Sequence, residues 1–230
     1  MTKIKICGIT NKEDAFWASS LGADFIGLNF VKNSLRKVSI DNAKEIIMSL
    51  PSYTSCVGVF FNEDAKEILK ICKKLNVNYI QLHGEETSDF CQNLKLEQPQ
   101  LKIIKTIKIK PKQEIPQNEI NEYISEISSK IEKYLPYVDY ILFDTHLENQ
   151  AGGTGKTFEW SLLKQIKENF NVMNKQFNFF VAGGLTPENV EEVIDFLEPW
   201  GVDVASGVER LPRRKDFEKM KIFIRKVKKK

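Results

Sequence analysis

The sequence has few of the features that mark membrane, nucleic-acid or metal-binding proteins. None of its apolar runs approaches the roughly 20 residues that a helix needs to cross a bilayer. The formal net charge of +3 over 230 residues is too small to indicate binding to nucleic acid. Only two histidines occur, and the four cysteines form no CxxC pair, so the ligand spacing of a zinc site is missing. We therefore expect a protein that binds no membrane, no nucleic acid and no metal ion.

The first residues also lack the apolar core and small-residue cleavage site of a secretory signal peptide. They lead directly into a strand pattern, so we expect a cytoplasmic protein. In that reducing compartment the cysteines should remain free thiols. Three of them, Cys56, Cys72 and Cys91, fall within strand or helix patterns and are predicted to pack as small core residues.

Short apolar segments recur along the chain and predict a parallel sheet that is covered on both faces. They are rich in Ile, Val, Phe and Tyr, and most run without polar alternation. Eight such segments occur: residues 3–9, 25–30, 56–61, 79–83, 102–107, 140–144, 179–182 and 202–205. Helical patterns separate them, with no change of composition along the chain. These eight units predict one α/β domain, residues 1–230, folded as a (β/α)8 TIM barrel.

Some of the intervening helices carry clear boundary signals. Asn11 can cap a helix that Gly22 ends. Thr186 and Pro187 are typical of a helix start, with Thr186 as the N-cap and Pro187 in the first position. A last helix is expected from about Asp216. The polar segment 108–118, with two prolines, is predicted to be a long surface loop.

A doubly wound open sheet would also alternate strands with helices. That fold places a GxGxxG phosphate fingerprint after its first strand, whereas this chain has Cys7-Gly8-Ile9-Thr10 there. We therefore favour the closed barrel.

Two reactive side chains stand where predicted strands end, which is where the active site of such a barrel lies. Cys7 ends the first strand, and its thiolate could be stabilised by dipoles or cations at the barrel mouth. Asp144 ends the sixth strand beside apolar residues, which should raise its pKa and suit it to act as a general acid. The alternatives are that Cys7 is an inert core residue and that Asp144 caps the following loop.

Glycine-rich turns follow the last two predicted strands. Gly183 and Gly184 lead from the seventh strand toward a helix, and Ser206 and Gly207 follow the eighth. Exposed backbone N–H groups and a helix dipole make such turns anion sites, and barrels often bind phosphate between these two strands. The pair of turns therefore predicts a phosphate site.

The glycine-rich segment 152–157 is not a P-loop, because Gln150 stands where that motif requires its first glycine. We interpret it as a flexible loop, containing Gly153 and Gly155, that could close over a substrate. Arg36 is either a surface arginine or a bidentate partner for a carboxylate. His83 could be a base or a ligand.

Together these residues resemble the phosphoribosylanthranilate isomerases of tryptophan biosynthesis. Ser34 and Arg36 follow the second matching segment, and Lys215-Asp216 follows the last. The segments occur in order along nearly the whole chain: KICGIT (5–10), GADFIGLNF (22–30), VGVFFN (57–62), IQLHGEE (80–86), FDT (143–145), GGTGKTFEW (152–160), AGGLTPENV (182–190) and VDVASGVE (202–209).

The resemblance implies a monomeric or homodimeric barrel that catalyses an Amadori rearrangement without a cofactor. N-(5-phospho-β-D-ribosyl)anthranilate, an aminoaldose, would become 1-(2-carboxyphenylamino)-1-deoxy-D-ribulose 5-phosphate, an aminoketose. By the family pattern, Asp144 would be the general acid that opens the sugar ring. Cys7 would be the general base that removes the proton from C2.

The resemblance also implies the binding residues. Arg36 would meet the anthranilate carboxylate, and His83 and Asp203 would lie near the substrate. The phosphate would be bound by Gly183, Gly184, Ser206 and Gly207.

One departure from the family pattern concerns the chain after the eighth strand. The family usually has Pro-Gly where this chain has Pro212-Arg213. A glycine adopts positive φ readily and an arginine resists it, so the shape of this loop is in question.

Two rival functions remain open from the sequence. The similar isomerase of histidine biosynthesis would be expected to carry an aspartate in place of Cys7. A barrel that only binds a phosphorylated ligand would have no need of Cys7, Asp144 and Arg36 together.

Overall fold

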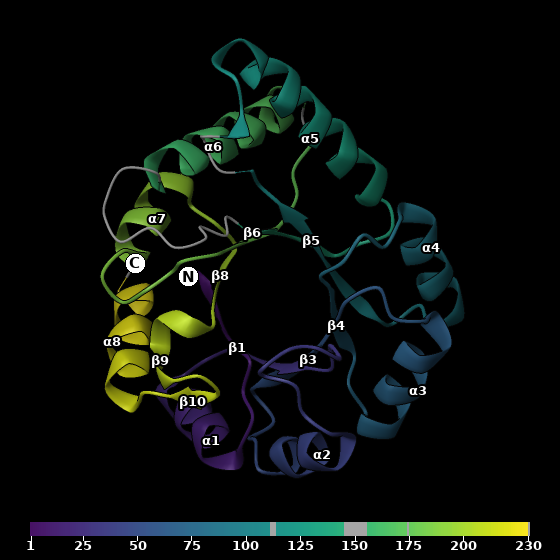
Figure 1. Cartoon of the computed structure of the whole chain (residues 1–230), viewed down its shortest axis with the longest axis vertical. Coiled ribbons are helices and arrows are strands. Elements are labelled where there is room, and N and C mark those ends of the chain that lie inside the picture. Colours follow the sequence, from purple (N-terminus) through teal and green to yellow (C-terminus); the bar gives the residue numbers. More distant parts are fainter. Residues whose placement is uncertain (111–113, 145–155, 174, 230) are drawn as a thin grey trace.

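Eight parallel strands close into a barrel in the part of the chain that the structure describes (Figure 1). The computed structural model describes residues 1–110, 114–144, 156–173 and 175–229, with the backbone alone in 156–159. Each strand is hydrogen-bonded to the next, and β8 pairs with β1 to close the ring. The strands are β1 (Lys3–Cys7), β2 (Phe25–Asn29), β3 (Ser55–Phe60), β4 (Tyr79–Leu82), β5 (Lys102–Lys108), β6 (Tyr140–Asp144), β7 (Phe179–Ala182) and β8 (Gly201–Val204).

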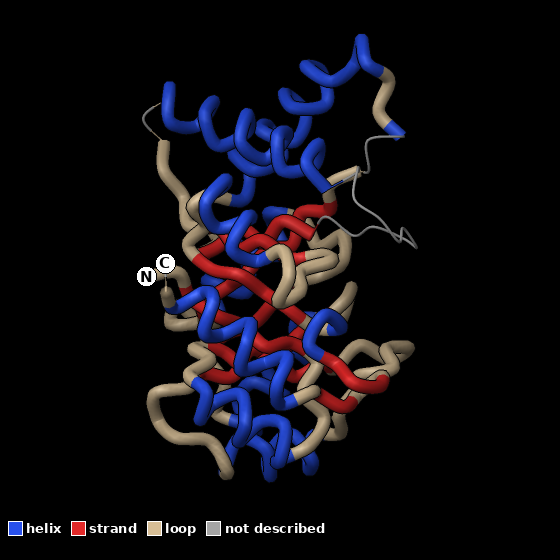
Figure 2. Tube along the Cα trace, turned by 90° about the vertical axis from the view of Figure 1, so that its left-hand side faces the viewer, coloured by secondary structure: helices blue, strands red, loops and turns tan. Residues whose placement is uncertain are grey.

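Helices form an outer layer around these strands, as Figures 1 and 2 show from two directions. They are α1 (Lys12–Leu21), α2 (Ile40–Met48), α3 (Ala65–Leu75), α4 (Ser88–Glu97), α5 (Ile120–Tyr134), α6 (Lys156–Val172), α7 (Val190–Leu197) and α8 (Phe217–Lys228). Two short 3₁₀ helices, η2 (Gln117–Glu119) and η3 (Ser206–Val208), and a small hairpin of β9 (Glu209–Leu211) and β10 (Arg214–Lys215) complete the described elements. Among these described helices, none has the length and apolar character that a membrane span would need.

The predicted (β/α)8 barrel is confirmed, and each strand ends within two residues of its predicted bounds. Strand β1 stops at Cys7 instead of Ile9 because Gly8 turns the chain with a φ of +72°. The predicted loop 108–118 contains the last residue of β5 and part of η2, and its residues 111–113 lie outside the described ranges.

The interior of the barrel differs between its two ends. At the amino ends of the strands, aromatic rings fill the space, and the centroid of Trp200 lies 4.5 Å from that of Tyr140 and 5.0 Å from that of Phe180. Side chains alternate along a strand, so in β6 Tyr140, Leu142 and Asp144 share one face. The first two pack in or against the inner apolar cluster, whereas Asp144 reaches the opposite, polar end.

Two predicted caps are confirmed. The Asn11 side chain accepts a hydrogen bond from the backbone N–H of Asp14 at 2.9 Å, and Gly22 ends α1 with a φ of +103°. The predicted start of the seventh helix is confirmed in part. The Thr186 hydroxyl accepts a hydrogen bond from the backbone N–H of Glu188 at 3.2 Å, as an N-cap does, but residues 187–189 form a turn and the regular helix α7 begins only at Val190.

Arg213 adopts a φ of +72° in the hairpin of β9 and β10, so the conformation that a glycine would favour is here taken by an arginine. Its carbonyl oxygen accepts a hydrogen bond from the Thr10 hydroxyl at 2.7 Å. The hairpin is thus fixed to the loop after β1 although the residue is unfavourable in this conformation.

Candidate active site

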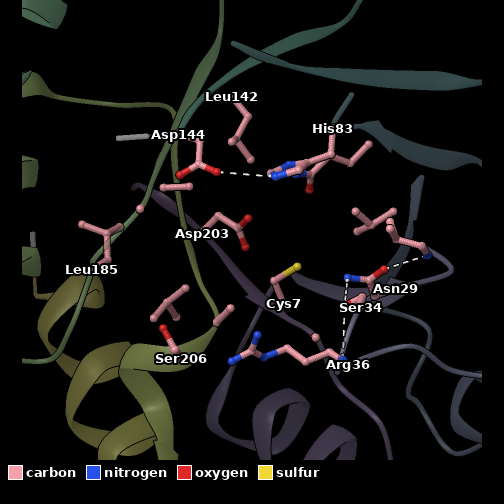
Figure 3. Close-up of a pocket in the computed structure, with 18 of the residues that line it drawn as sticks. Cys7, Asn29, Ser34, Arg36, His83, Leu142, Asp144, Leu185, Asp203 and Ser206 are labelled. Carbon is pink, nitrogen blue, oxygen red and sulfur yellow. Dashed lines mark hydrogen bonds and ion pairs between the residues drawn. The ribbon is translucent and has the colours of Figure 1, made fainter. Parts of the chain in front are cut away.

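A cavity of about 350 Å³ opens at the carboxyl ends of the strands (Figure 3). All predicted site residues that fall in the described ranges line it. They are Cys7, Arg36, His83, Asp144, Gly183, Gly184, Asp203, Ser206 and Gly207. The predicted loop residues Gly153 and Gly155 lie outside the described ranges. The volume lies within the range of small-molecule sites.

Cys7 is the last residue of β1, and its side chain projects into the cavity. Burial raises the pKa of the Cys7 thiol, whereas the positive charges of Lys5 and Lys215 act to lower it and the charge of Asp203 acts to raise it. The net shift is upward. The thiolate form therefore depends on the positive charge in its surroundings.

Lys5 precedes Cys7 by two residues on the same face of β1 and is fully buried. Its ammonium donates a hydrogen bond to Oδ2 of Asp203 on β8 at 2.9 Å. Burial alone would lower the pKa of Lys5, but the charges of Asp203 and Cys7 outweigh this and raise it. Lys5 is therefore a permanent cation beneath the thiol.

Asp203 has one oxygen that is still available for a ligand. Its Oδ1 is buried and has no hydrogen-bond partner among the described residues, while the residue itself lines the cavity. A buried carboxylate oxygen without a donor is costly, so a hydroxyl or amine of a bound ligand would stabilise it.

Asp144 ends β6 and faces His83, which directly follows β4 (Figure 3). Oδ2 of Asp144 lies 3.5 Å from Nε2 of His83, and the Gln81 amide lies 3.1 Å from Nδ1. Burial lowers the pKa of His83, and the opposing charge of Asp144 doesn't restore it. Nδ1 also lies 3.2 Å from the Thr106 hydroxyl, so Gln81 and Thr106 together hold the ring in place opposite Asp144.

Arg36, in the loop after β2, forms a two-point ion pair with Glu209 on β9. Its Nε donates to Oε1 at 2.7 Å and its Nη2 donates to Oε2 at 2.6 Å. Gly8 makes room for this side chain, because a Cβ at Gly8 would collide with Cδ of Arg36. Hydrogen bonding to Glu209 raises the pKa of Arg36, so the guanidinium stays charged at the cavity wall.

The predicted phosphate turns both depend on glycine, the first through its backbone conformation and the second through a close contact. Gly183 and Gly184 have φ of +83° and +65°. A Cβ at Gly207 would collide with the carbonyl oxygen of Leu185, so the turns after β7 and β8 approach each other closely. Asn189 supports the first turn, since its side chain donates to the Gly184 carbonyl at 2.9 Å.

Sequence reasoning missed the buried ions that support these groups. Glu209 and Lys215 lie in segments that match the family, yet neither residue type suggested a role. Lys5 had a signal: the alternation of KIKIC places it on the same face as Cys7. Within the described ranges, no group of three or more His, Cys, Asp or Glu side chains could hold a metal ion.

A family model described as N-(5'phosphoribosyl)anthranilate (PRA) isomerase matches residues 4–226. The curated N-(5'-phosphoribosyl)anthranilate isomerase of Thermoanaerobacter sp. (strain X514) is 39% identical over 227 residues, covering 99% of this chain and 98% of the relative. The same-named enzyme of Thermotoga maritima is 36% identical over 229 residues, covering 99% of each.

Solved structures of isomerases with the same name also superpose on this chain. The crystal structure of the isomerase from Thermotoga maritima superposes with a TM-score of 0.80 at 35% identity, with both chains fully covered. Another isomerase, solved in complex with reduced 1-(o-carboxyphenylamino)-1-deoxyribulose 5-phosphate, superposes with a TM-score of 0.78 at 32% identity and full coverage of both chains. A third structure shows mutually generated monomers of the dimeric isomerase from Thermotoga maritima. It superposes with a TM-score of 0.77 at 33% identity, with both chains fully covered. With the family model matching almost the whole length, the chain belongs to the phosphoribosylanthranilate isomerase family.

Proposed function

We propose that Asp144 and Cys7 are the general acid and the general base of the isomerase reaction. As a member of its family, the protein is an isomerase of tryptophan biosynthesis. It converts N-(5-phospho-β-D-ribosyl)anthranilate to 1-(2-carboxyphenylamino)-1-deoxy-D-ribulose 5-phosphate. The observation that carries the two assignments is that a carboxyl group and a thiol, from β6 and β1, line one cavity between an arginine and two glycine turns.

In the first step Asp144 protonates the ring oxygen of the furanose. The bond between C1 and that oxygen breaks, and the lone pair of the anthranilate nitrogen forms a C1=N double bond. The product is a cationic Schiff base with a free hydroxyl. His83 lies 3.5 Å from Asp144, and because burial lowers its pKa, little of its imidazole is protonated near neutral pH.

In the second step Cys7 removes the proton from C2. The electron pair of that bond forms C1=C2, and the electrons of the C=N bond return to nitrogen and neutralise the cation. The enolamine then takes up a proton at C1 and loses the proton of its C2 hydroxyl to solvent, which leaves a ketone at C2. The cationic Schiff base is itself the electron sink, so the reaction needs no cofactor.

The Schiff base also favours the charged form of its base. Burial raises the pKa of Cys7, and Lys5 and Lys215 only partly offset this. A cation formed on the substrate beside the sulfur adds a third positive charge, which stabilises the thiolate at the stage when it is needed.

The two anionic ends of the substrate account for the remaining lining groups. We assign the anthranilate carboxylate to Arg36, because a guanidinium binds a carboxylate through two parallel hydrogen bonds. The phosphate is assigned to Gly183 and Gly184 together with Ser206 and Gly207. Asp203 Oδ1 is a suitable acceptor for a sugar hydroxyl. A relative is solved in complex with reduced 1-(o-carboxyphenylamino)-1-deoxyribulose 5-phosphate, a ligand with both a carboxylate and a phosphate, which supports a site for two anionic groups.

The test replaces Asp144 with asparagine, which keeps the shape and cannot donate the proton. With phosphoribosylanthranilate generated in situ, we expect the enzyme-catalysed loss of its fluorescence to slow by a factor of about 10²–10⁴. Cys7→Ser should show a loss of similar order. Asp41→Asn, at an exposed carboxylate in the first turn of α2, is the matched control. Near-normal turnover in a folded Asp144→Asn protein would refute the assignment.

The assembly state and cellular location stay predictions. A relative is described as dimeric, which supports the expectation of a monomer or homodimer. Sedimentation velocity at micromolar concentration would distinguish the two. The cytoplasmic location fits a biosynthetic enzyme with free thiols.

A further inference from the structure

We propose that Glu209 is a positioning residue that turns the guanidinium of Arg36 toward the substrate carboxylate. In this way Glu209 sets the preference of the enzyme for a carboxylated aryl amine. The inference rests on the proposed function, since it assumes that Arg36 binds that carboxylate.

The ion pair uses one edge of the guanidinium and leaves the other available. Arg36 donates to both oxygens of Glu209 through Nε and Nη2, at 2.7 and 2.6 Å. A guanidinium has five N–H donors, so two on Nη1 and one on Nη2 remain. Among the described residues, no acceptor is hydrogen-bonded to Nη1. The free edge has the spacing that a second carboxylate needs for two parallel hydrogen bonds.

Glu209 is itself held in place, as a positioning residue must be. Its side chain is 6% exposed, and Oε1 also accepts from the ammonium of Lys215 at 3.1 Å. Lys215 is fully buried and donates to the carbonyl of Ala205 at 2.9 Å, next to the turn assigned to phosphate. Burial would raise the pKa of Glu209, but hydrogen bonding to Arg36 and the charge of Lys215 lower it, so the carboxylate stays ionised.

The rest of Arg36 is restrained as well. Its backbone N–H donates to the Ser34 hydroxyl at 3.2 Å, and its side chain crosses Gly8. In Figure 3 the side chain runs from the Arg36 label below Cys7 and toward the side of the cavity where Ser206 lies. With both ends fixed, the arginine loses little conformational freedom when substrate binds. Without Glu209, it would have to lose that freedom on binding.

The charge of Glu209 alone would predict the opposite effect. A carboxylate beside Arg36 weakens the attraction of the site for any anion, so its removal should then improve binding of substrate. Positioning predicts weaker binding, and only when the substrate has the carboxylate. The two explanations therefore differ in sign.

The experiment compares kcat/KM for phosphoribosylanthranilate with that for N-(5-phosphoribosyl)aniline, which lacks the carboxylate. We expect Glu209→Gln to lower kcat/KM about tenfold for the first substrate, mainly through KM, and to change the second by less than twofold. Glu218→Gln, at an exposed glutamate on α8, is the matched control. An unchanged or increased preference for phosphoribosylanthranilate in Glu209→Gln would overturn the inference.

Two further variants separate the possible failures. Arg36→Met should remove the preference for phosphoribosylanthranilate over the aniline analogue, and adding Glu209→Gln to it should cause no further loss of that preference. A further loss would mean that Glu209 acts by another route. If Arg36→Met keeps the wild-type preference, the assignment of Arg36 in the proposed function fails. If only Glu209→Gln keeps it, the positioning role alone fails. Should Glu209→Gln not fold, Glu209→Asp keeps the charge but shortens the reach, and a smaller loss of preference is expected.

Discussion

Replacing Lys5 with methionine should slow the alkylation of Cys7 by lowering the fraction of its thiol that is ionised, while the thiol stays in place. Lys5 is fully buried, its ammonium lies 2.9 Å from Asp203, and its charge lowers the pKa of Cys7. Methionine has a similar length without the charge. The variant removes the cation and leaves Asp203, whose charge raises the pKa of the thiol, without its ionic partner.

The expected size follows from Coulomb's law. Unit charges about 4 Å apart, at an effective dielectric constant of about 20, interact by about 4 kcal/mol. At roughly 1.4 kcal/mol per tenfold change, that is a factor of several hundred in the thiolate fraction at a fixed pH below the thiol pKa. A more basic thiolate is also more nucleophilic, and this offsets about half of the change on a logarithmic scale. The rate of alkylation should therefore fall roughly 30-fold. We therefore expect Cys7 to be alkylated at least tenfold more slowly.

Iodoacetamide labelling followed by mass spectrometry can measure this rate site by site. Burial raises the pKa of Cys56, Cys72 and Cys91 to about 12, so these thiols should be nearly inert at pH 8. Lys105→Met is the matched control. Lys105 is another buried lysine, paired with Glu86 at 2.7 Å, and the charges of this pair shift the pKa of Cys91 instead of that of Cys7. Wild-type labelling of Cys7 in a folded Lys5→Met protein would refute the electrostatic account.

Three further predictions address the turns and the pH dependence. Arg213→Gly should raise the free energy of unfolding in urea titrations by up to about 1 kcal/mol, because it relieves a φ of +72°. The greater conformational freedom of glycine in the unfolded chain limits the gain, and a lower free energy of unfolding would contradict the prediction. Gly207→Ala should raise KM more than tenfold, because its Cβ would collide with the Leu185 carbonyl, and an unchanged KM would place the phosphate elsewhere. Burial would raise the pKa of Asp139, but hydrogen bonds from two lysines and a backbone N–H lower it, so its contribution to stability is present above the unfolded pKa and is lost as pH falls through the folded pKa. Asp139→Asn should therefore reduce the loss of stability between pH 7 and pH 3, and an identical loss in both proteins would contradict the assignment.

The sequence was sufficient for the barrel because its signals are local. The segment 140–144 is apolar up to its last residue, and the structure places β6 at those bounds, with Asp144 at the cavity. The glycine turns were similarly clear, since positive φ at Gly183 and Gly184 is a property of the residue type.

The errors and omissions have a different physical origin. The Thr186 hydroxyl does accept from the backbone N–H of Glu188, as its local signal predicts, but the regular helix begins only at Val190, after a turn of residues 187–189. The ion pairs at the cavity join residues that are 198 positions apart for Lys5 with Asp203 and 173 apart for Arg36 with Glu209. No pattern within one segment can predict such a pairing. The sequence therefore predicted the cavity groups better than the charges that support them.

The unequal ends of the barrel interior bear on how this enzyme can acquire new chemistry. The aromatic cluster around Trp200 buries large apolar surfaces at the amino ends of the strands, while Asp144, Cys7 and the charged groups near Cys7 lie at the other end. Substitutions among the loops at the mouth thus leave that cluster in contact and keep most of the stability it provides. A lineage could exchange Cys7 or reshape the wall around Arg36 over many generations without losing a folded barrel in between.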